Sequence, residues 1–192
     1  MGLLDVLTGK RKLAKPAPDR LFAMSTAYVT FETGLDLKTR GAAAIVFQSL
    51  ATADFRAIVT DMEEVVRATA GDSGTAVETS EDDFGFSWLI LRGSDFDDLV
   101  VGLNAVSSAL ESGGYGERLL CAVFAFQDSR ERPAYWIYNY KRGFFYPFVP
   151  AAGGHAQQRD NERELVLKAQ IGSELPLEPE LARWFPLWGI PI

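Results

Sequence analysis

The residue types that could do chemistry in this chain are one histidine, one cysteine and several groups of carboxylates. His155 is the only histidine and would be the natural general base, but it lies in the glycine-rich stretch AAGGHAQQ, where a base would be held loosely. Cys121 lies in the apolar run LLCAV, with no cation beside it to favour the thiolate. We therefore expect Cys121 to be a buried apolar side chain and not a nucleophile.

Carboxylates gather in the acidic loop Glu81–Asp83 and in the pair Asp97 and Asp98. Such groups can bind a hard cation or act as acid and base, although turns and helix starts also favour them. An enzyme built on this chain would bring the acidic loop and His155 together in a concave pocket. We keep that enzyme as an alternative, and we predict no catalytic residue, no cofactor and no metal ligand.

Composition narrows the classes of protein. The 192 residues carry a net charge of −7, which removes the electrostatic basis for binding nucleic acid. A single cysteine allows no internal disulfide, which favours a reducing, cytoplasmic location. The longest uncharged stretch, Gly143–Gln158, is interrupted by glycine and proline, so no membrane span is expected. The length suits one domain.

The charge is distributed unevenly. Residues 1–20 hold five basic and two acidic residues, a local charge of +3 that leaves −10 for the remainder. Prolines at 16 and 18 end any helix that begins upstream, so we predict a tail over 1–18 and one domain over 19–192. On a helical wheel, one arc of the tail would hold Leu3, Leu4, Val6 and Leu7, and the basic residues Lys10, Arg11, Lys12 and Lys15 follow. Such a tail would make weak contact with an anionic membrane surface, or would dock on the domain itself.

The domain begins with two similar segments, at about 26–70 and 76–112. In each, an apolar run precedes apolar residues at helical spacing, and the two sets lie 41 residues apart. Possible partner strands lie in front, at 27–33 and 76–80. The pattern indicates two β-β-α units in tandem, although amphipathic helices resemble one another by chance.

The second half is aromatic. Strand-like runs at 118–127, 134–140 and 143–149 are followed by a charged segment at 159–171. We predict this segment to be helical, and the alternation in Glu164-Leu165-Val166-Leu167 makes a strand the alternative. Strand alternation sends the aromatic side chains to both faces of the sheet, so one face needs cover. The tryptophans of the chain's own proline-rich end would supply it, and a binding partner is the alternative. The fold class is α+β, with a largely antiparallel sheet and helices on one face.

Several segments resemble one family almost from end to end: MGLLDVLTGKRK, SWLILRGSDFDDLVVGLNAVSSALESGGYGERLLCAVFAF, YNYKRGFFYPFVP, RDNE and LPLEPELARWFPLWGIP. They are similar to PspAB, the PspA-associated protein B of actinobacteria and some archaea. The resemblance implies a protein encoded beside a PspA-type membrane-stress effector, with an accessory or regulatory part in a phage-shock-type envelope stress response. It brings no enzymatic activity and no catalytic residues.

We therefore expect a non-enzymatic interaction protein that binds a PspA-type coiled coil or another component of that response. We expect a cytoplasmic location, and the tail would allow peripheral contact with the inner face of the cell membrane. The residues expected to make contact are Leu3, Leu4, Leu7, Lys10, Arg11, Lys12, Lys141, Arg142, Trp184 and Trp188. The alternatives are the enzyme described above and a small-ligand sensor with a cavity under the aromatic strands.

Overall fold

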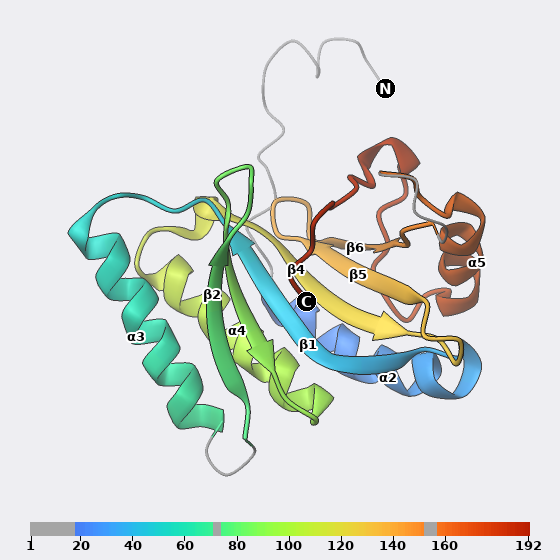
Figure 1. Cartoon of the computed structure of the whole chain (residues 1–192), viewed down its shortest axis with the longest axis horizontal. Coiled ribbons are helices and arrows are strands. Elements are labelled where there is room, and N and C mark those ends of the chain that lie inside the picture. Colours follow the sequence, from blue (N-terminus) through green and yellow to red (C-terminus); the bar gives the residue numbers. More distant parts are fainter. Residues whose placement is uncertain (1–17, 71–73, 152–156) are drawn as a thin grey trace.

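A six-stranded antiparallel sheet organises the molecule (Figure 1). The computed structural model describes residues 18–70, 74–151 and 157–192. The strands lie in the order β2-β3-β1-β4-β5-β6. Their bounds are β1 (Lys38–Phe47), β2 (Ala76–Glu81), β3 (Ser87–Arg92), β4 (Leu119–Gln127), β5 (Pro133–Asn139) and β6 (Phe144–Phe148).

Helices pack on one face of this sheet and beside its β6 edge (Figure 1). Their bounds are α2 (Ala23–Gly34), α3 (Ala53–Ala70), α4 (Phe96–Ser112) and α5 (Asn161–Ile171), with short 3-10 helices at Pro18–Phe22, Gly116–Arg118 and Leu181–Arg183. The predicted fold class, α+β with an antiparallel sheet and helices on one face, is confirmed.

Local signals explain where the helices begin and end. The Asp95 carboxylate accepts hydrogen bonds from the backbone N–H groups of the first turn of α4, at 2.9 and 3.3 Å. Thr52 does the same for α3, where its hydroxyl lies 3.3 Å from the Phe55 nitrogen. Asp160 caps α5, and Gly172 ends it with a positive φ of 56°. The predicted helix at 159–171 is therefore confirmed.

The partner strand predicted at 27–33 is wrong. These residues belong to α2, whose buried side chains Met24, Ala27 and Phe31 recur at helical spacing, while Val29 is 63% exposed. The segment 26–70 is therefore α-β-α, whereas 76–112 forms the predicted β2-β3-α4 unit. The portion that the two segments share is a strand followed by a helix.

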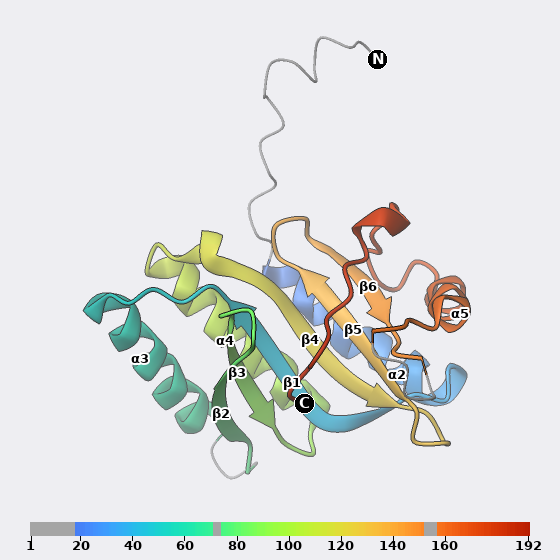
Figure 2. The ribbon, with the colours of Figure 1, turned by 45° about the horizontal axis from the view of Figure 1, so that its top comes forward.

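Each interior strand is buried on both faces. One cluster, on the helix side, includes Phe31, Phe124 and Trp136. The other lies on the opposite face and includes Trp88 and Phe148. Figure 2 shows what covers this second face: the C-terminal segment runs across β5 and β4 and ends beside β1. Its members in the cluster are Trp184, Leu187, Trp188, Ile190 and Ile192.

The prediction that the chain's own end covers the aromatic sheet is therefore confirmed. Hydrogen bonds fix the end of this C-terminal segment. The Ile192 oxygen accepts from Arg40 at 3.3 Å and from the Tyr135 hydroxyl at 3.4 Å, and the Pro191 oxygen accepts from Arg92 at 3.2 Å.

Candidate functional site

The two edge strands of the sheet, β6 and β2, differ in their backbone pairing. At the β6 edge the chain pairs with itself, because the Phe145 nitrogen donates to the Pro176 oxygen at 2.8 Å and the Glu178 nitrogen donates to the Phe145 oxygen at 2.9 Å. β2 is the other outer strand, and most of its residues are exposed. The β2 edge is therefore the side at which the sheet can accept another chain.

A groove of about 630 Å³ lies between α3 and β2. These two elements are the helix and the strand at the left of Figure 1. Its apolar lining includes Phe47, Leu50, Phe55 and Val59. Phe47 and Phe55 contact each other, with ring centroids 5.9 Å apart, and they are almost fully buried beneath the groove. The half-buried Leu50 and Val59 are the apolar side chains that a molecule in the groove would reach first.

Charges surround this apolar lining. Glu63 of α3 and Glu81 of β2 line the groove, together with the single guanidinium of Arg56. Glu63 forms an exposed ion pair with Arg67 at 3.5 Å, whereas Glu81 has no ion-pair partner within the described part of the chain. The groove thus combines an apolar floor with acidic side chains on both walls.

The acidic loop next to the groove has a structural use. Oδ1 of Asp82 accepts from the backbone nitrogens of Phe84 and Phe86, each at 2.9 Å, and Oδ2 accepts from the Trp88 indole at 2.9 Å. Asp82 therefore fixes the β2–β3 turn. His155 lies outside the described residues, so the predicted meeting of this loop with His155 stays a prediction. In the ranges that the structure describes, no three His, Cys, Asp or Glu side chains gather as metal ligands.

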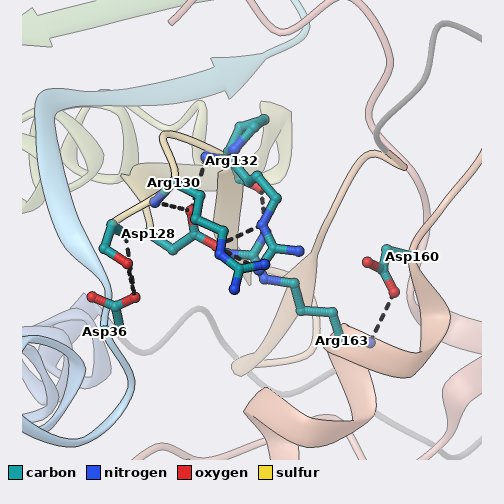
Figure 3. A network of polar contacts seen from close by, with 8 residues as sticks. Asp36, Asp128, Arg130, Arg132, Asp160 and Arg163 are labelled. Atoms are coloured by element: carbon teal, nitrogen blue, oxygen red, sulfur yellow. Dashed lines mark hydrogen bonds and ion pairs between the residues drawn. The ribbon is translucent and has the colours of Figure 1, made fainter.

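A second hollow, of about 410 Å³, lies where α5 meets the β4–β5 turn and the loop before β1. Figure 3 shows its polar network, which centres on Asp128. Asp128 accepts from the backbone nitrogens of Arg130 and Arg132 at 3.0 and 2.9 Å, and forms ion pairs with Arg132 at 2.7 Å and Arg163 at 3.1 Å.

These contacts determine the charge state of Asp128. Burial alone would raise the pKa of this carboxyl, but the N–H groups and guanidinium groups around it lower the pKa below its usual value. Arg163 also donates to the Pro133 oxygen at 3.2 Å, and Ser129 donates to Asp36. These contacts join α5, the β4–β5 turn and the loop before β1, so the network has a structural role.

The structure places the predicted contact residues of the second half at different depths. Trp184 is 4% exposed, its indole lies over Tyr146 with ring centroids 6.2 Å apart, and its N–H donates to the Glu178 oxygen. Trp188 is half-buried against Phe148. Both tryptophans therefore pack within the fold, and Trp184 is inaccessible to a partner in this conformation.

The two predicted basic contacts also differ. Lys141 is exposed, at the turn between β5 and β6. Arg142 forms a two-point ion pair with Glu178, whose side chain is 2% exposed, and this pair raises the pKa of Arg142. Arg142 thus ties the turn to the C-terminal region. The tail residues Leu3, Leu4, Leu7, Lys10, Arg11 and Lys12 lie outside the described residues.

Three polar residues with specific contacts in the structure could not be recognised in the sequence. The sequence shows Arg159, Glu164 and Glu178 only as members of charged stretches, and nothing local marks the two glutamates as buried at 2% exposure. The same holds for the groove, because its lining comes from several elements: the end of β1, the following loop, α3, β2 and the start of β3.

The fold defines an α+β protein with one sheet edge closed by its own chain and the other edge open beside an acidic groove. The chain matches the family PspAB, PspA associated protein B, over residues 1–192, and it belongs to that family. The family name implies association with PspA. No curated protein and no solved structure matches the chain. Across the described ranges, no helix has the length and apolar character that crossing a membrane requires.

Proposed function

We propose that this protein is a non-enzymatic accessory or regulatory component of a PspA-type membrane-stress response, and that it works by binding a PspA-type protein. The observation that carries this proposal is the family match over the whole chain, because the name of the family implies association with PspA. The β2 edge, which has no further strand beside it among the described residues, supports the proposal together with the adjoining groove, since they offer a partner both unpaired backbone and apolar surface.

Peripheral membrane contact through the tail is the second part of the proposal. The sequence of residues 3–15 supports it, because leucines are followed by Lys10, Arg11 and Lys12. Each basic residue near an anionic surface contributes about 1 kcal/mol, so contact through this segment alone would be weak and reversible. A second attachment, through the PspA-type protein, would make it effective.

The test is co-sedimentation of the full-length protein with vesicles of anionic phospholipid, with and without the PspA-type protein from the same source. A variant with Leu3→Ser, Leu4→Ser and Leu7→Ser keeps the chain length and serves as the matched comparison. We expect binding to the PspA-type protein in both forms, and a loss of direct vesicle binding in the variant. Failure of the full-length protein to bind the PspA-type protein at low salt would contradict the proposal.

A further inference from the structure

The edge strand β2 has features that select its partner. β2 carries two glutamates, Glu78 and Glu81, and no basic residue, so pairing with β2 of a second copy would place one acidic strand beside another. Like charges across a pair of strands are destabilising, so a second copy of this chain fits the edge poorly. A strand that carries lysine or arginine would instead meet opposite charges.

The charge around the groove extends beyond its lining. The helix α3 and the β2–β3 hairpin, residues 53–70 and 76–92, hold eight carboxylates and three arginines and no lysine. Arg92 is already paired with Glu78 at 3.1 Å and Arg67 with Glu63 at 3.5 Å. The negative charge that remains lies on both sides of an apolar floor, and this combination complements a segment that is both basic and apolar.

We infer that the groove between α3 and β2 binds an extended basic segment of a partner protein, which adds a strand to the β2 edge. Alternate side chains of that segment would enter the groove over Leu50 and Val59. On this same face of the segment, lysine or arginine side chains would lie beside Glu63 and Glu81, because both glutamates line the groove. This inference rests on the proposed function, because the partner segment would belong to the PspA-type protein or to another component of the same response.

The direct experiment uses a labelled synthetic peptide with the repeat Val-Val-Lys-Lys as the probe, with the full-length protein, because this repeat places both valine and lysine on each face of an extended strand. We expect saturable binding, slower hydrogen exchange of β2 amides, and chemical-shift changes confined to α3, β2 and the loop at 48–52. An otherwise identical peptide with glutamate in place of lysine should not bind. Equal binding of both peptides, or shift changes elsewhere on the surface, would overturn the inference.

Charge reversal distinguishes binding in the groove from attraction to the overall negative charge of the protein. The variant Glu63→Lys/Glu81→Lys should weaken peptide binding by at least about tenfold, because it places like charges beside the basic segment. The matched variant Glu162→Lys/Glu180→Lys makes the same change of net charge at exposed positions of α5 and the C-terminal region. It should bind the peptide within about twofold of the original chain, the difference expected when no contact of the interface changes.

The same two variants are then measured against the PspA-type protein. If the original chain binds that protein and both variants bind equally well, the groove is not the docking surface, although the proposed function stands. If the original chain does not bind it but the groove still binds the basic peptide, the proposed function fails and the groove remains a peptide site.

One further outcome would identify a different occupant. The variant with serine at Leu3, Leu4 and Leu7 should show unchanged amide signals in β2 and α3 when no peptide is present. Signals in the groove that move in this variant would mean that the chain's own N-terminal segment occupies the groove, which would overturn the inference of a partner segment.

Discussion

The guanidinium of Arg159 holds the carboxylate of Glu164 at two points, with Nε 3.0 Å from Oε1 and Nη2 2.8 Å from Oε2. Glu164 is 2% exposed and also accepts from the Val149 nitrogen at 2.8 Å. Arg159 donates in addition to the Trp184 oxygen and lies over the Phe148 ring at 5.5 Å. One side chain therefore connects α5, the end of β6 and the C-terminal segment.

Removing this arginine should be costly. Arg159→Ala leaves a buried carboxylate without its partner, so we expect the free energy of unfolding to fall by about 3–5 kcal/mol. Equilibrium urea unfolding followed by tryptophan fluorescence measures it. Arg67→Ala, which breaks only the exposed pair with Glu63, is the control and should change stability by less than about 0.5 kcal/mol. Equal effects of the two substitutions would contradict the role assigned to Arg159.

Asp128 should make the protein sensitive to acid. Its folded pKa lies below the unfolded value of about 3.9, so its contribution to stability is complete above that value and is lost as the pH falls through the folded pKa. We expect Asp128→Asn to lower stability at neutral pH by about 1–3 kcal/mol and to flatten the loss of stability below about pH 4.

Urea unfolding at a series of pH values measures both effects of Asp128. Asp128→Glu keeps the charge but moves the oxygens away from the N–H groups of Arg130 and Arg132, and should recover only part of the acid dependence. An Asp128→Asn variant with the same stability difference from the original chain at every pH would show that this carboxyl does not control acid stability.

Trp184 should be essential for covering the face of the sheet that lies opposite the helices. Trp184→Ala removes an indole that is 4% exposed and stacked on Tyr146, which should cost about 3–5 kcal/mol. It should also increase binding of a hydrophobic dye, because part of the sheet is uncovered. Phe185→Ala is the neighbouring control: this ring is 56% exposed, and its loss should change stability by about 0.5 kcal/mol or less.

Cys121 should be unreactive in the native protein. Burial raises the pKa of this thiol to about 12, so the thiolate that attacks alkylating reagents is scarce and also inaccessible. We expect modification by N-ethylmaleimide to be slow in the native state and fast in denaturing urea, with mass spectrometry as the readout. Rapid native modification would place Cys121 on an exposed surface, contrary to the structure.

Much of the fold was accessible from sequence because its signals are local. The alternating strands around Phe124 and Trp136, the capping residue Asp95 and the terminating Gly172 lie within or beside the elements they define. The helix α2 was misread because Tyr28, Val29, Thr30 and Phe31 favour strands by type. Burial of Met24 and Phe31 against the sheet overrides that preference, and it depends on partners far along the chain.

The candidate site was less predictable from the sequence because it also depends on contacts between separate segments. The acidic loop can be recognised in the sequence, but a groove exists only once α3 and β2 are placed beside each other. The buried carboxylates of Glu164 and Glu178 could not be distinguished from solvated ones in the sequence. Each contacts its partner, Arg159 or Arg142, only in the folded chain.

The C-terminal cover has a consequence for biosynthesis. Residues 184–192 are synthesised after every strand of the sheet, so a chain that stops before Trp184 holds all six strands without this cover. Such a shortened chain would expose the apolar face around Trp88 and Phe148 to water. Stalled or prematurely terminated chains of this protein should accordingly aggregate or be degraded.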